Sequence, residues 1–132
     1  MSCEQALTLL GLAKRAGRVS AGEDMTREAV ADHKARLLLL AADAGEAVCR
    51  RAERMRTDKL PLVQLTADKA VLGAALGRES CAVCAVTDLG FAARMAALLA
   101  QEDESFAAAV AELERRQAKA LRRKKEKPRR KH

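Results

Sequence analysis

Residues 35–43 read ARLLLLAAD, and this stretch decides the fold class. Four consecutive leucines between alanines form a short apolar run, which suits a strand that is buried on both faces. Asp43 follows directly, with Glu46 three residues later, and this spacing fits a capping box that opens a helix. A strand buried on both faces indicates a sheet that helices cover on both sides.

Helical and extended segments alternate on either side of this stretch. Apolar residues recur at helical spacing, and the other strands are short runs bounded by turn residues. The expected helices cover residues 2–16, 23–33, 43–56, 66–76 and 90–100, and the expected strands cover residues 18–21, 35–42, 61–65 and 81–86. The helix caps are expected at Ser2, Asp43, Thr66 and either Thr87 or Asp88. This order predicts an α/β fold, a three-layer α/β/α sandwich around a central four-stranded mixed sheet.

The character of the chain changes near residue 101. An acidic start, an alanine-rich stretch and a basic end predict a final helix whose charges suit its dipole. Two parts are therefore expected, a compact domain over residues 1–101 and a helical to disordered basic tail over residues 102–132. The sequence contains no apolar run of membrane-spanning length and no signal peptide, so we expect a cytoplasmic protein with no membrane contact.

Positive charge is concentrated in the tail. Residues 115–132 hold eleven Lys or Arg side chains and one acidic residue, Glu126, so this segment has a net charge of +10. The whole chain has a net charge of +7. The rest of the chain is therefore mildly acidic, at −3. A tail of this kind can neutralise phosphates and release their counterions, which points to a polyanion partner. The alternative interpretation is a solubilising end without a ligand.

The sequence offers little for catalysis. The two histidines are His33, at an expected helix end, and His132, and neither has a nucleophile or a metal-ligand pattern beside it. Cys81 and Cys84 lie three residues apart within an expected strand, so their side chains should point to opposite faces as two buried thiols. We therefore expect neither enzyme activity nor a cofactor. An enzyme that uses Cys84 or Cys49 is the least favoured alternative.

A glycine turn begins the second helix. Gly22 follows a short strand and precedes a helix start, where free N–H groups can meet phosphate or base edges. The alternative interpretation is an ordinary helix N-cap without a ligand. Phe91 and Phe106 are the only aromatic residues, so base stacking of the kind that many RNA-binding modules use is not expected. If this domain binds RNA, shape recognition of a folded RNA is favoured.

The chain resembles the ribosomal protein family L-seven-Ae / L-thirty-e, in particular its bacterial YlxQ-like branch. The resemblance runs in order over roughly residues 4–100. The matching pieces are residues 9–18 (LLGLAKRAGR), 20–23 (SAGE), 35–44 (ARLLLLAADA), Thr66, 72–73 (LG) and 85–92 (AVTDLGFA). It implies an α/β/α sandwich that binds RNA, in particular kink-turns, through the start of the second helix and the loop before the last strand.

The helix motif of the family departs from its pattern in this chain. The family has Gly-x-Asn-Glu with a Lys three residues after the Glu, and here Gly22 keeps the glycine position. Asp24, Met25 and Glu28 occupy the Asn, Glu and Lys positions, which puts two carboxylates where RNA would lie. Arg27 offers partial compensation. The second contact loop corresponds to residues 77–80, where Arg78 is the candidate RNA ligand.

The sequence therefore predicts a non-catalytic RNA-binding protein of ribosomal-protein type, monomeric, that recognises structured, kink-turn-like RNA. Ribosomal or RNA-processing proteins are further candidate partners. The candidate RNA-binding residues are Arg18, Gly22, Glu23, Asp24, Arg27, Lys34, Arg78, Arg122, Arg123, Lys124, Lys125, Arg129 and Arg130. The alternative hypothesis is a protein-interaction module on an RNA-binding fold whose contact motif has eroded.

Overall fold

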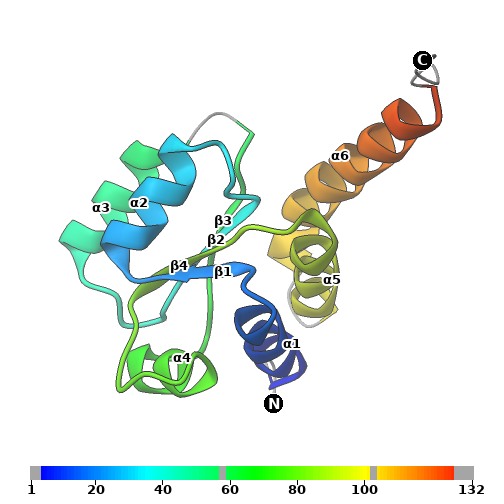
Figure 1. Cartoon of the computed structure of the whole chain (residues 1–132). Coiled ribbons are helices and arrows are strands. Elements are labelled where there is room, and N and C mark those ends of the chain that lie inside the picture. Colours follow the sequence, from blue (N-terminus) through cyan, green and yellow to red (C-terminus); the bar gives the residue numbers. More distant parts are fainter. Residues whose placement is uncertain (1–3, 57–58, 102–103, 127–132) are drawn as a thin grey trace.

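The computed structural model describes residues 4–56, 59–101 and 104–126 (Figure 1). Helices and strands alternate as predicted. The helices are α1 (Glu4–Arg15), α2 (Glu23–Ala31), α3 (Glu46–Met55), α4 (Lys69–Ala75), α5 (Leu89–Ala100) and α6 (Ala107–Glu126), and a 3-10 turn at Glu104–Phe106 precedes α6. The strands are β1 (Val19–Ala21), β2 (Leu37–Leu40), β3 (Leu62–Gln64) and β4 (Val83–Val86).

The four strands form one mixed sheet in the order β1-β4-β2-β3. β2 and β3 are parallel, whereas β4 is antiparallel to both β1 and β2. β2 therefore lies inside the sheet, and all four of its leucines are buried. The prediction that residues 35–42 form a fully buried strand is confirmed, with ends that the structure shortens to Leu37–Leu40.

The leucine side chains of β2 lie alternately on the two faces of the sheet. Leu37 and Leu39 join the core that α1, α4, α5 and α6 cover, whereas Leu38 and Leu40 pack on the side of α2 and α3. Figure 1 shows α2 and α3 together on one side of the sheet and α1, α4 and α5 on the other. The predicted three-layer α/β/α sandwich is confirmed, because successive strand side chains point to opposite faces.

Helix α6 begins on the domain and then leaves it. Leu113 is fully buried, and Phe106, Ala109 and Val110 pack against the same core. Beyond this contact the orange and red part of α6 extends past the sheet (Figure 1). The predicted domain boundary between residues 101 and 102 stays a prediction. In the described part of the chain, no helix combines the length and the apolar character that a membrane span requires.

Two predicted helix caps are wrong. The N-cap of α3 is Gly45, which makes no side-chain cap, and Asp43 instead accepts a hydrogen bond from the backbone N–H of Lys69 at 2.8 Å. The N-cap of α4 is Asp68, whose carboxylate accepts from Val71 N at 2.8 Å, and not Thr66. Asp43 thus accepts a hydrogen bond from the first residue of α4, a helix that is distant in sequence. Asp88 caps α5, as one of the two alternatives predicted, and Ser2 lies outside the described residues.

Candidate RNA interface

The turn from β1 to α2 has the backbone that only glycine adopts freely. Gly22 has φ 91°, a left-handed value, and it is the N-cap of α2 without any side-chain cap. Its N–H donates to Val83 O at 2.9 Å, which fixes the turn at one end of the sheet. The first N–H groups of α2 are therefore left for a ligand, and the positive end of the helix dipole lies with them.

Arg78 lies directly against this turn. Its guanidinium nitrogen Nη1 donates to the carbonyl oxygen of Ala21 at 3.1 Å. A Cβ atom at position 22 would lie 3.5 Å and 3.6 Å from the two terminal nitrogens of Arg78, which is ordinary van der Waals contact, so the guanidinium lies beside Gly22, and the positive φ is what requires glycine there. The structure thus brings together the two segments that the sequence predicted as contact regions.

A second glycine holds the loop that carries Arg78. A Cβ atom at Gly73 would lie 2.5 Å from Ser80 Cα, which no real Cβ atom tolerates, so α4 packs directly on the backbone of this loop. Arg78 N also donates to Gly73 O at 2.8 Å. In the sequence, Gly73 stands out only as one of the residues that match the family. Its role could not be predicted, because the close contact with the backbone of Ser80 leaves no local pattern in the sequence.

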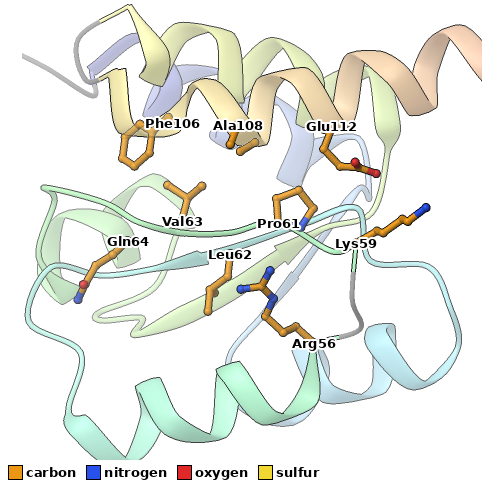
Figure 2. Close-up of a pocket in the computed structure, with 10 residues that line it drawn as sticks. Arg56, Lys59, Pro61, Leu62, Val63, Gln64, Phe106, Ala108 and Glu112 are labelled. Carbon is orange, nitrogen blue, oxygen red and sulfur yellow. The ribbon is translucent and has the colours of Figure 1, made fainter.

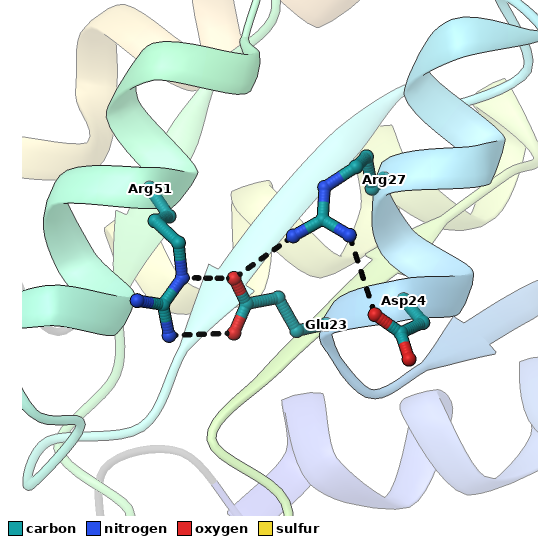
Figure 3. Close-up of polar contacts among 4 residues, drawn as sticks. All are labelled: Glu23, Asp24, Arg27 and Arg51. Carbon is teal, nitrogen blue, oxygen red and sulfur yellow. Dashed lines mark hydrogen bonds and ion pairs between the residues drawn. The ribbon is translucent and has the colours of Figure 1, made fainter.

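An ion-pair network covers the first turn of α2 (Figure 3). Arg51 of α3 binds the carboxylate of Glu23 through Nε and, at 2.9 Å, through Nη2. Arg27 contacts Glu23 at 3.1 Å and Asp24 at 3.2 Å. The hydrogen bond from Arg51 lowers the pKa of Glu23 below its ordinary value, and the charges of Arg51 and Arg27 add to this effect. Arg51 was not among the predicted site residues, because 28 residues separate it from Glu23.

The ion pairs decide which of the predicted contact residues keep an unpaired charge. Its two carboxylates and two guanidiniums cancel in formal charge, so Arg27 already has partners and Glu23 is already neutralised. Asp24, whose side chain is 98% exposed, and Met25, 51% exposed, point away from the fold. The uncompensated positive features of this surface are Arg78 and the helix start.

Two predicted residues lie at the other end of the sheet. Arg18 O accepts from Thr87 N, whereas Gly22 N bonds to Val83, so Arg18 and Gly22 stand at opposite ends of β1. Lys34 follows α2, next to Arg36, whose N–H donates to Val86 O. The structure therefore does not bring Arg18 and Lys34 to the Gly22 turn. Their place in RNA binding stays a separate prediction.

The tail residues lie on or beyond the last turns of α6. Arg122 and Arg123 are exposed on the helix. Lys124 and Lys125 belong to α6, but the structure describes only their backbone. Arg129 and Arg130 lie outside the described residues, and so do His132 and the rest of the chain end.

Cys81 and Cys84 are core residues. Cys81 lies just before β4 and donates from Sγ to Val83 O at 3.1 Å, and Cys84 is fully buried in the same core as Cys81. The prediction that the two point to opposite faces is wrong, because Cys81 is outside the strand. Burial raises the pKa of the Cys84 thiol well above its usual range, which opposes use as a nucleophile. Among the described residues, no three His, Cys, Asp or Glu side chains are placed to share a metal ion.

Comparison with known proteins gives three findings. RNA-binding protein YlxQ of Bacillus subtilis (strain 168) is 37% identical over 100 residues, which are 75% of this chain and 99% of that protein. A protein with unknown function from Bacillus halodurans is similar in structure, with a TM-score of 0.68 and 31% identity over 72% of this chain and 96% of that one. A Giardia lamblia 15.5kD RNA binding protein has a TM-score of 0.61 and 21% identity, over 76% and 85% of the two chains, which shows a shared fold. No protein-family model matches the chain.

Proposed function

The chain belongs to the L-seven-Ae / L-thirty-e family, in its YlxQ-like branch, and from this we propose that it is a non-catalytic protein that binds structured RNA. The RNA docks at the surface formed by the β1–α2 turn and the loop at residues 77–80. Helix α6 adds contacts to phosphates. Related proteins that carry RNA binding in their names support this proposal.

The single observation that carries the proposal is the position of Arg78 beside Gly22. A guanidinium held at 3.1 Å from Ala21 O, next to an uncapped helix start, offers a cation and several N–H donors within one small surface. Arg is suited to phosphate and to the acceptor edge of guanine, because its donors form a planar fork. Helix N–H groups supply further donors to the same phosphate or base.

We propose a kink-turn or a similarly sharp RNA bend as the ligand. Neither Phe91 nor Phe106 lies in the β1–α2 turn or the loop at 77–80. This surface therefore has no aromatic ring on which the bases of a single-stranded RNA could stack. A bent RNA presents closely spaced phosphates and unpaired base edges to a compact donor group. The Asp24 and Glu28 carboxylates, both exposed, limit how closely phosphates approach along α2 and direct the RNA toward Arg78.

A second candidate function rests on the same exposed side chains. Asp24 and Glu28 are acidic and Met25 is apolar, and together they would fit a basic protein surface better than a phosphate backbone. In that case the module binds a protein partner and has lost RNA recognition at α2. RNA binding measurements separate the two functions.

The test compares three labelled RNAs of equal length and charge by fluorescence anisotropy with the full chain. They are a kink-turn, an uninterrupted duplex and a single strand. We expect tighter binding to the kink-turn, and we expect Arg78→Ala to weaken that binding about tenfold, since a hydrogen bond to a charged group is involved. Arg94→Ala, which removes an exposed arginine from α5, is the matched control. Equal affinity for all three RNAs, unchanged by Arg78→Ala, would exclude the docking surface and favour the second function.

A further inference from the structure

A second group of basic residues lies at the end of the sheet opposite Gly22. There a cavity of about 180 Å³ lies between the loop that joins α2 to β2, Leu60 just before β3, and Arg116 of α6. The residues that line it are Val30, His33, Ala35, Arg36, Leu60 and Arg116. None of these six is acidic, and two are arginines.

The two arginines present unused donors to this cavity. Arg36 donates from Nη1 to the carbonyl oxygen of His33 at 3.1 Å, which holds its side chain at the loop. Arg116 donates from Nε to Glu112 at 2.8 Å, and within the described residues its two terminal nitrogens make no other bond. Glu112 is shared by Arg115 and Arg116, so these three residues keep one positive charge, and Arg36 adds a second beside the same cavity. The site is therefore suited to an anionic group.

Two further basic side chains, of Arg56 and Lys59, line a second hollow that α6 borders. This hollow is a groove of about 490 Å³ between β3 and α6 (Figure 2), and Pro61 is also among the residues that line it. Glu112 also lines this groove, and hydrogen bonds from Arg115 and Arg116 lower the pKa of its carboxyl and compensate its charge. We call the surface made by Lys34, Arg36, Arg56, Lys59 and Arg116 the α6 junction.

The α6 junction depends on a segment beyond the shared domain. YlxQ is matched over 99% of its length by 75% of this chain, so this chain has residues that YlxQ lacks. Helix α6 begins at Ala107, after the stretches that carry the family resemblance. Arg116 lines the same cavity as Arg36 because Leu113, one turn earlier, is fully buried in the core and fixes the helix on the domain.

We infer that the α6 junction is a second RNA-contacting site, which binds backbone phosphate between Arg36 and Arg116. This inference rests on the proposed function, since it assigns a second contact to the same RNA. Arg18 and Gly22, at the two ends of β1, are roughly 13 Å apart at about 3.3 Å per strand residue. Arg36 lies at the Arg18 end of the sheet, where its N–H donates to Val86 O, so an RNA that contacts both sites must extend along the strands of the sheet.

The experiment measures the salt dependence of RNA binding by the full chain, with the kink-turn and the uninterrupted duplex as probes. Each phosphate contact contributes about 0.9 to the slope of log K against log salt. We expect Arg36→Ala and Arg116→Ala each to make the slope shallower by about one, and to weaken both RNAs by the same factor. Arg36→Lys, which keeps the charge, should retain the slope. The control is Arg94→Ala, which removes the same charge from α5 and should leave the slope unchanged.

The outcomes separate this inference from the proposed function. If Arg78→Ala removes the preference for the kink-turn while Arg36→Ala behaves like Arg94→Ala, the docking surface stands and the α6 junction is wrong. If the unmodified chain binds neither RNA at low salt, both are overturned. Arg36→Ala leaves α6 intact, so a loss of slope in that variant does not come from an undocked helix. A loss confined to Arg116→Ala would indicate helix undocking and would contradict the inference.

Discussion

Arg51 of α3 holds the carboxylate of Glu23 with two nitrogens, and thereby joins two helices on one face of the sheet at the point where RNA is expected to dock. Without this pair, Glu23 would keep only Arg27, which also pairs with Asp24, and the group beside the start of α2 would carry a net negative charge. The pair therefore connects the packing of α2 and α3 with the electrostatics of the Gly22 turn.

Removal of Arg51 should weaken RNA binding although Arg51 need not touch RNA. We expect Arg51→Ala to lower the affinity for the kink-turn about fivefold, because Arg27 alone then balances two carboxylates and the net negative charge repels phosphate in a largely aqueous surrounding. The double variant Arg51→Ala with Glu23→Gln should recover most of the affinity. Anisotropy titrations at low salt measure both. Failure of the double variant to recover binding would mean that Arg51 itself contacts RNA.

The Glu23 pair also predicts a pH dependence of stability. The pKa of Glu23 is lowered from its ordinary value of 4.5, chiefly by the hydrogen bond from Arg51. A carboxyl with a lowered folded pKa stabilises the fold above its unfolded pKa, and this contribution is lost as the pH falls through the folded pKa. Glu23→Gln should therefore lower the melting temperature at neutral pH, and the difference should shrink as the pH falls below about 4.5 and vanish below the lowered pKa of Glu23.

The control for this pH series is Glu28→Gln on the same helix, where the carboxylate is exposed. Its melting temperature should follow that of the unmodified protein across the whole pH range. A Glu23→Gln difference that persists unchanged in acid would show that the ionised pair contributes nothing to stability.

Gly73 offers a test of how the Arg78 loop is held. Alanine is the better helix former by about 1 kcal/mol, yet a Cβ atom at Gly73 would meet Ser80 Cα at 2.5 Å. We expect Gly73→Ala to destabilise the protein by about 1–3 kcal/mol through overpacking, and to weaken RNA binding by displacing Arg78. Val71→Ala, at an exposed position of the same helix, should be close to neutral. Urea unfolding and RNA titration measure the two effects, and an unchanged Gly73→Ala variant would contradict the close packing.

Leu113 tests whether the first half of α6 belongs to the core. Leu113 is fully buried, so Leu113→Ala should lower the free energy of unfolding by about 2–5 kcal/mol. Leu121 lies two turns later and is 59% exposed, so Leu121→Ala should change it by less than about 0.5 kcal/mol. Equal, small effects in urea unfolding would show that α6 does not dock on the domain in solution.

The sequence predicts most of this fold because its signals are local. The leucine run at residues 37–40 can be satisfied only by burial on both faces, and the alternation of segments then defines three layers. The turn at Gly22 and the loop of Arg78 were also predictable as contact segments through the family resemblance. Their direct contact, at 3.1 Å from Arg78 to Ala21, required the structure.

The remaining features depend on long-range contacts that local patterns do not specify. The sequence predicts that Asp43 begins its own helix, but its carboxylate accepts from Lys69 N at the start of α4, 26 residues away. Arg18 was grouped with Gly22 because the two are near in sequence, whereas an extended strand places them at opposite ends of the sheet. Arg51 gives no signal in its own surroundings that it will bind Glu23.

The most direct test of the central claim is a map of backbone amide shifts in the full chain during titration with kink-turn RNA, by NMR. The account predicts that the amides of Gly22, Glu23, Asp24 and Arg78 shift most strongly, while those around Arg94 on α5 stay in place. Shifts confined to α6, with the Gly22 turn and the Arg78 loop unmoved, would contradict the claim that this surface recognises RNA.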